Sequence, residues 1–233
     1  MDNVQRFLDA FAIIEKRLKQ ITGMTKYTGF FQLLNLAAKK NALVRRAQLD
    51  LQEYAELRNA IVHQRSGDGS ILAIPVEEVV EDIETLAKQL EDPEIVGKHF
   101  SKPVRICHPD TDLQVAFEIM NKMETSKVPV YSQGSFHSLL TMEMIARWMM
   151  HQYQHQLPLM GQVRDCLKYK GKQERVRFLS KDASISEAQD IFENALKKGV
   201  SLSAILITES GQMHQKPIGI ITVSDLPLLY SIS

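Results

Sequence analysis

In the first 95 residues, apolar positions are spaced as in amphipathic helices, and no strand pattern is found. Near the start, apolar residues recur at steps of three and four: Leu8, Phe11, Ile14 and Leu18. This spacing predicts a helix over 3–21. Three further helices are predicted, one after Gly29 that continues into LAAKKNALVRR, one over about 47–63 and one after Pro75. Four helices with short connections predict an antiparallel four-helix bundle over 1–95, with Asp92-Pro93 as the linker.

From residue 96 onward, short apolar runs rich in β-branched residues alternate with helical stretches: VPVY, SAILIT and IGIIT. An internal repeat underlies this alternation, because several similar residues recur 72 positions apart. The matched pairs are Val104 with Val176, Arg105 with Arg177, Leu113 with Ile185, Ala116 with Ala188 and Ile119 with Ile191. We therefore predict two β-α-β-β-α units, repeat 1 over about 96–158 and repeat 2 over about 159–233, which pack on each other. The predicted fold class is α + α/β.

The second repeat, with VRFLSKDASISEAQDIF, LSAILITESG and PIGIITVSDL, resembles a cystathionine-β-synthase-type (CBS) domain. The segment 104–149 resembles its degenerate partner, so 96–233 is similar to a tandem CBS pair. The resemblance implies a regulatory adenine nucleotide (AMP, ATP or a cyclic dinucleotide) and no required cofactor. It assigns the ribose to Thr222 and Asp225 of the Thr-x-x-Asp motif, and the wall against the base to Ala204 and Ile205.

The chemistry of Asp225 suits a sugar, because a carboxylate accepts charge-assisted hydrogen bonds from both ribose hydroxyls. The alternative is that Asp225 only caps the final helix, since Asp is a common N-cap residue. In the first repeat Thr141 is present, but Met144 stands three residues later and cannot accept from a ribose. We therefore expect one competent cleft, not two.

The third predicted helix ends in LRNAIVHQR, in which Arg58, Asn59 and His63 resemble the Arg-x4-6-His motif of HEPN domains. With Leu57 set at zero on the helix, Ile61 lies near 40°, whereas Arg58, Asn59 and His63 lie at about 100°, 200° and 240°, away from the core. The resemblance implies a dimeric, metal-independent endoribonuclease or a binding module that has lost activity. His63 would act as general acid or base, Arg58 would stabilise the phosphorane charge, and Asn59 would orient a phosphate or the imidazole. The alternative is a solvated helix face with a histidine near its C-terminus.

Charge is balanced over the chain, with 28 basic and 28 acidic residues, but it is unevenly placed. Ten basic and three acidic residues lie within 16–65, and eight acidic residues surround Lys88 within 77–94. These regions either neutralise each other within the bundle or dimer, or leave a basic surface for RNA phosphate. No apolar run reaches the roughly 18 residues of a membrane helix, and no secretory signal is expected.

The two cysteines, Cys107 and Cys166, are expected to be reduced structural thiols in a cytoplasmic protein. His151 and His155 lack a third ligand, so no metal site is predicted. The function expected from the whole sequence is nucleotide sensing by a CBS pair that controls a HEPN-like domain, which cleaves or binds RNA, in a homodimer without membrane attachment. The alternative is a non-enzymatic CBS signalling module whose helical bundle serves dimerisation or partner binding.

Overall fold

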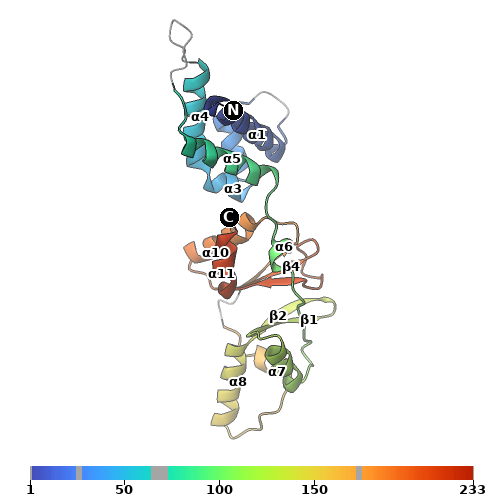
Figure 1. Cartoon of the computed structure of the whole chain (residues 1–233). Helices are drawn as coiled ribbons and strands as arrows, with labels where there is room; N and C mark the ends of the chain where they lie inside the picture. Colours follow the sequence, from blue (N-terminus) through green and yellow to red (C-terminus); the bar gives the residue numbers. More distant parts are fainter. Residues whose placement is uncertain (1, 25–27, 64–72, 172–174, 233) are drawn as a thin grey trace. The chain divides into compact units, whose positions relative to one another are not determined.

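The computed structural model describes residues 2–24, 28–63, 73–171 and 175–232 (Figure 1). The chain divides into two compact units, Met1–Glu94 and Ile95–Ser233. The described part of the first unit contains five helices: α1 (Asn3–Thr22), α2 (Phe30–Ala38), α3 (Ala42–Arg46), α4 (Gln48–His63) and α5 (Glu77–Glu91). The first unit is therefore helical in all its regular structure that the model describes.

The core of the helical unit forms where the apolar face of α1 meets the other helices. Phe7, Ile14 and Leu18 of α1 have no exposed surface, and neither do Leu51 of α4 and Ile83 of α5. These positions follow the three- and four-residue spacing that the sequence shows, so burial of one helix face accounts for the local fold.

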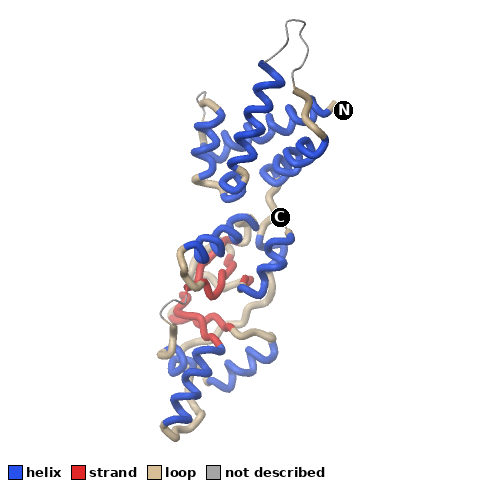
Figure 2. Tube along the Cα trace, turned by 90° about the vertical axis from the view of Figure 1, so that its left-hand side faces the viewer, coloured by secondary structure: helices blue, strands red, loops and turns tan. Residues whose placement is uncertain are grey.

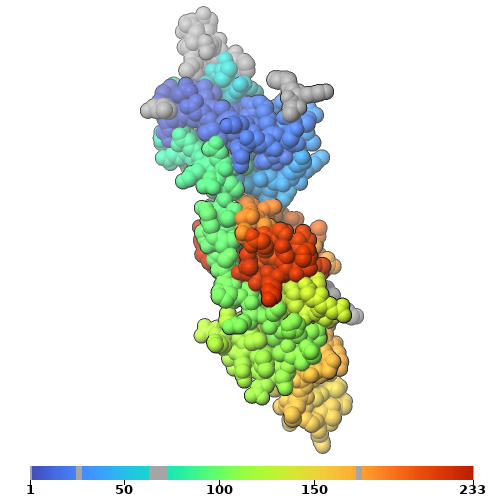
Figure 3. Space-filling view, turned by 90° about the vertical axis from the view of Figure 1, so that its right-hand side faces the viewer, coloured from blue at the N-terminus to red at the C-terminus, as the bar shows by residue number. Residues whose placement is uncertain are grey.

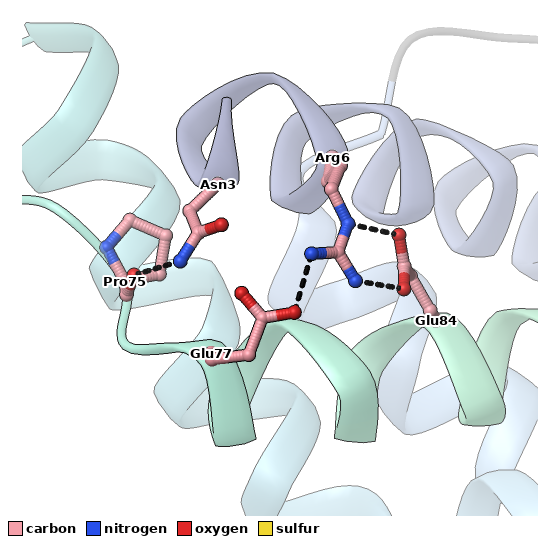
Figure 4. Close-up of polar contacts among 5 residues, drawn as sticks. All are labelled: Asn3, Arg6, Pro75, Glu77 and Glu84. Atoms are coloured by element: carbon pink, nitrogen blue, oxygen red, sulfur yellow. Dashed lines mark hydrogen bonds and ion pairs between the residues drawn. The ribbon is translucent and has the colours of Figure 1, made fainter. Parts of the chain in front are cut away.

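A charged cluster joins α1 to α5 on the outside of this core (Figure 4). The Arg6 guanidinium donates from Nε and Nη2 to the two carboxylate oxygens of Glu84 at 2.9 and 2.7 Å, and from Nη1 to Glu77 at 2.5 Å. Beside it, the Asn3 side chain donates to the carbonyl of Pro75 at 3.3 Å. Hydrogen bonds from Arg6 lower the pKa of both glutamates. Part of the acidic charge of α5 is thus neutralised by α1, at a residue outside the basic run of 16–65.

The predicted four-helix bundle is not confirmed, because the second predicted helix is interrupted. It ends at Ala38, and a separate helix α3 begins after Asn41. Asn41 has extended backbone angles, and its side chain accepts a hydrogen bond from the amide of Val44 at 3.0 Å. An asparagine side chain that accepts a hydrogen bond from the amide three residues later favours the start of a new helix over the continuation of the old one.

The second unit contains both repeats, and repeat 1 opens with a short helix. The first part holds α6 (Val96–Phe100), α7 (Leu113–Lys122), β1 (Lys127–Ser132), β2 (Ser135–Thr141), α8 (Met142–Gln154) and α9 (Val163–Leu167). The second part holds β3 (Arg175–Ser180), α10 (Ile185–Lys197), β4 (Leu202–Thr208), β5 (Gly219–Ile221), the 3-10 helix η1 (Val223–Asp225) and α11 (Leu226–Ser231). The second part follows the predicted β-α-β-β-α order, whereas the first part has two helices, α6 and α7, before its first strand.

The strands form two sheets that lie between the helices of the second unit (Figure 2). β1 and β2 form an antiparallel hairpin, whereas β4 lies between a parallel β3 and an antiparallel β5. The first strand predicted for repeat 1 is reduced to a single bridge between Cys107 and Val130. Repeat 2 therefore has the full predicted β-α-β-β-α order, and repeat 1 has an incomplete version of it.

The two repeats pack on each other through their strands. Leu139 of β2 contacts a buried cluster on the other sheet that contains Ala204, Leu206 and Ile220. Near it, the rings of Phe136 and Phe178 meet edge to face at 5.2 Å between centroids. This confirms the prediction that the sheet faces of the two repeats cover each other.

The segment that contains α6 is held against repeat 2. Val96 and Phe100 are buried in its core, and the amide of Gly97 donates to the carbonyl of Lys181 at 2.9 Å. In Figure 3 the green surface of this segment borders the red surface of the last residues of the chain. The first residues of repeat 1 thus pack on repeat 2 before the chain continues into the helices and strands of repeat 1.

Candidate functional site

The Thr-x-x-Asp motif forms a tight turn at the end of β5. Asp225 Oδ2 accepts hydrogen bonds from the amide of Thr222 at 2.7 Å and from its hydroxyl at 2.9 Å. Asp225 stands at the N-cap position of α11, but its side chain makes no capping bond to that helix. The carboxylate instead closes the turn before the helix through Oδ2, which fixes its orientation. Its other oxygen, Oδ1, takes no part in these two bonds.

Both residues of the motif line a cavity of about 260 Å³ in the second unit. Its wall comes from three segments far apart in the sequence: 102–105, the stretch from α7 to β1, and the end of β5 with η1. The lining residues are Lys102, Pro103, Val104, Arg105, Ile119, Met123, Glu124, Thr125, Ser126, Lys127, Val128, Ile220, Thr222, Ser224 and Asp225. The cavity therefore lies between the two repeats and needs both of them.

The cavity combines an apolar wall with charged and hydroxyl groups. Val104, Ile119, Val128 and Ile220 supply aliphatic surface, and Asp225 supplies a fixed carboxylate at one side. Ligand sites commonly show this combination, in which apolar surface gives contact area and a few polar groups fix orientation. The arrangement can accept a flat apolar group and a polyhydroxyl group together.

The sequence prediction missed the cationic residues of this cavity. Lys102 and Arg105 lie in KPVR near the start of repeat 1, and Lys127 begins β1. The ammonium of Lys102 lies 3.7 Å from Asp225 Oδ1. The one available signal was that Arg105 belongs to the repeat, since it matches Arg177, but that match does not reveal which face Arg105 occupies.

Ala204 and Ile205, predicted to form the wall against a base, do not line this cavity. Both lie on β4, the central strand of its sheet, and neither has exposed surface. Ala204 packs at the interface between the repeats, and Ile205 packs in the core of repeat 2. Ile220, which belongs to the neighbouring strand β5, lines the cavity instead.

The corresponding turn of repeat 1 is closed to a ligand. Thr141 accepts a hydrogen bond from the amide of Met144 at 3.3 Å and so caps α8. The Met144 side chain occupies the place of the acidic residue and is fully buried in the core of repeat 1. An apolar side chain in the core offers no acceptor to a sugar at this turn.

The helical unit places two of its three candidate residues at the surface of α4. Asn59 is exposed and Arg58 is half-buried, and Arg58 Nη1 donates to Asn59 Oδ1 at 3.3 Å. Leu51 and Ile61 of the same helix are buried. His63 is the last residue of α4, and its side chain lies outside the part of the chain that the structure describes.

The described residues hold no group of three or more potential metal ligands. The rings of His151 and His155 stack at 4.2 Å between centroids, and His155 Nδ1 lies 2.8 Å from the carbonyl oxygen of His151. Cys107 and Cys166 are buried free thiols. Burial, with a smaller contribution from Asp165, raises the pKa of Cys166 to about 12, and burial alone raises that of Cys107.

No helix in the described ranges has the length and apolar character required to cross a bilayer. A comparison with curated proteins gave no match. Among solved structures, the CBS domain pair of protein MJ0100 in complex with 5'-methylthioadenosine and S-adenosyl-L-methionine is 17% identical, covering 60% of this chain and 97% of that chain with a TM-score of 0.40.

Two other CBS structures are similar to the same extent. CBSX2 in complex with AMP is 12% identical over 60% of this chain and 98% of that chain, with a TM-score of 0.40. A CBS domain-containing protein from Kribbella flavida is 19% identical over 60% of this chain and 99% of that chain, with a TM-score of 0.42. The CBS domain family itself matches residues 96–151 and again residues 173–226. Because that match falls once on each repeat, the C-terminal unit is a tandem pair of CBS domains.

Proposed function

We propose that the cavity between the two CBS domains binds an adenine nucleotide that regulates the protein. The observation that carries this proposal is the placement of Asp225, whose Oδ2 is fixed by Thr222 while its carboxylate lines the cavity. The two ribose hydroxyls are vicinal donors, and a fixed carboxylate accepts from them without having to be reoriented. The purine lies against the aliphatic residues that line the cavity.

Isothermal titration of the full chain with AMP, ATP and a cyclic dinucleotide tests this proposal. Asp225→Asn keeps the size of the side chain and removes its charge, so the nucleotide that binds should bind about tenfold more weakly, the loss of one charge-assisted bond. Asp110→Asn, at an exposed position outside the cavity, is the matched control and should leave affinity unchanged. Unchanged affinity in Asp225→Asn, or no binding to the unaltered chain, contradicts the proposal.

A second function is proposed for the helical unit, namely metal-independent cleavage of RNA under control of the CBS pair. The observation that favours it is the pair of Arg58 and Asn59 on the outer face of α4, joined by a hydrogen bond while the opposite face is buried. Arg58 stabilises charge on the phosphorane, Asn59 orients the phosphate, and His63 transfers the proton. Two chains in a homodimer supply one histidine as base and the other as acid.

RNA cleavage in the presence of EDTA separates this function from that of a binding module. Arg58→Ala and His63→Ala should each abolish cleavage, whereas Glu56→Gln, an exposed change on the same helix, should retain it. If the unaltered chain and the three variants all cleave RNA only at the background rate, the alternative of a non-enzymatic signalling module remains. Sedimentation equilibrium checks the homodimer, since a mass of one chain contradicts the shared acid and base.

A further inference from the structure

The ammonium group of Lys102 lies beside the carboxylate that is proposed to hold the ribose. Its Nζ is 3.7 Å from Asp225 Oδ1, and the two side chains are 53% and 22% exposed. This distance is within ion-pair range but too long for a hydrogen bond. The pair is therefore an attraction between two partly solvated groups, which a stronger acceptor can replace.

The backbone of Lys102 is fixed while its side chain extends into the cavity. Its amide donates to the carbonyl of Ile218 at 3.0 Å, and the preceding residue, Ser101, forms an antiparallel bridge with Gly219. Phe100 anchors the same segment in the core of repeat 2. A long flexible side chain on a fixed backbone can move its ammonium between neighbouring acceptors without disturbing the fold.

The cavity lining is more cationic than anionic. Lys102, Arg105 and Lys127 carry positive charge, and Glu124 and Asp225 carry negative charge. Hydrogen bonds from ribose hydroxyls leave the charge of Asp225 in place, so the lining holds three positive and two negative charges whether or not the sugar is bound. This imbalance favours a ligand that brings its own negative charge into the cavity.

We propose that the ligand is a phosphorylated nucleotide, and that Lys102 exchanges Asp225 for the phosphate when the ligand binds. This inference rests on the proposed nucleotide function and adds to it the residue that determines the ligand's charge. A phosphate monoester carries about −1.5 to −2 charges at neutral pH and three strong acceptor oxygens. The ribose then takes the place of Lys102 at the carboxylate, and the phosphate takes the place of the carboxylate at Lys102.

The exchange distinguishes ligands that differ only in charge. Adenosine separates Lys102 from Asp225 and offers the ammonium no acceptor in return. S-adenosyl-L-methionine carries two positive groups, a sulfonium and an ammonium, and one carboxylate of its own. Its net charge is positive, so it adds positive charge to a cavity that already has more cations than anions. AMP satisfies both members of the ion pair, and we expect it to bind most tightly of the three.

Isothermal titration of the full chain with AMP, adenosine and S-adenosyl-L-methionine tests the exchange. The unaltered chain should bind AMP at least tenfold more tightly than adenosine. Lys102→Met should remove about tenfold of that preference, equivalent to about 1.4 kcal/mol, by weakening AMP while adenosine is unchanged or bound more tightly. Lys122→Met, an exposed lysine of α7 outside the cavity, is the matched control and should retain the preference.

Lys102→Arg keeps the positive charge and should keep the preference for AMP, which separates loss of charge from loss of folding. Equal affinity for AMP and adenosine in the unaltered chain overturns the inference, and so does an unchanged preference in Lys102→Met. In either case binding that depends on Asp225 still supports a nucleoside site. Absence of binding to all three probes removes the proposed function as well, so the two failures are distinguishable.

Discussion

Alanine at position 219 is expected to disturb both the stability of the CBS pair and its cavity. Gly219 begins β5 at the point where the segment after α6 crosses it. A Cβ atom added there would lie 2.3 Å from the carbonyl oxygen of Phe100 and 3.0 Å from Cδ1 of Ile207. The first distance is about 1 Å shorter than ordinary van der Waals contact, and its partner is backbone, which cannot rotate away.

The size of the effect follows from what must move. Separating Gly219 from Phe100 breaks the hydrogen bond between the Lys102 amide and Ile218, a loss of about 1 kcal/mol. Overpacking in a filled site adds roughly 1–3 kcal/mol, and the lower entropy of alanine in the unfolded chain offsets about 0.5–1 kcal/mol. The net destabilisation is about 1–3.5 kcal/mol, which lowers the unfolding temperature of a unit of this size by roughly 3–14 °C.

Differential scanning calorimetry of the full chain measures this shift, and titration with AMP measures the consequence for the cavity. Gly29→Ala is the control, because a Cβ there meets nothing within 4 Å and the backbone φ is −60°. It should cost at most about 0.5 kcal/mol, the difference between glycine and alanine at an N-cap. Equal unfolding temperatures and equal AMP affinity for Gly219→Ala and the unaltered chain would refute the close packing of this segment on β5.

Three further predictions concern charge and burial. Arg6 lowers the pKa of two carboxyl groups on α5, so their stabilising effect is complete above their ordinary pKa of 4.5 and disappears as pH falls through the lowered values. Arg6→Met should therefore lower the unfolding temperature at neutral pH and flatten its decline on acidification. Met144→Asp should not create a second binding turn but should destabilise the CBS pair in urea by roughly 3–5 kcal/mol, because it buries an unpaired charge. Cys107 and Cys166 should react with a thiol reagent at pH 7.5 only on unfolding, since both are buried with raised pKa values; rapid reaction of the native chain would contradict their placement.

Local sequence patterns were sufficient for most of the elements and for the motif turn. The helix predicted over 3–21 is α1. Thr222 and Asp225 contact each other because they are three positions apart and a single turn of chain is enough to join their side chains. The break at Asn41 was not predicted, although asparagine favours N-caps, because the apolar spacing on either side of it is continuous. Apolar periodicity identifies the buried face of a helix. It does not show whether an N-cap residue within the pattern starts a new helix or the existing helix continues through it.

The composition of the cavity could not be read from the sequence for a different reason. Lys102, Lys127 and Asp225 are brought together only by the packing of one repeat on the other. Ala204 and Ile205 were predicted to face a ligand, but β4 is a central strand covered on both sides. A continuous apolar run is typical of such a strand, and it contains no alternation that distinguishes one face from the other.

The segment that follows residue 94 gives the proposed regulation a physical route. It leaves the helical unit, is anchored in repeat 2 by α6, and then contributes Lys102 to the cavity. A ligand that moves the ammonium of Lys102 therefore acts on the same stretch of chain that connects the two units. Such a ligand changes the helical unit only if two arrangements of this segment bind it with different affinity. The exchange of Asp225 for phosphate moves the Lys102 side chain on a backbone held by Ile218 and Gly219, so transmission to the helical unit requires in addition that this backbone adopt a second arrangement with a different affinity for the ligand.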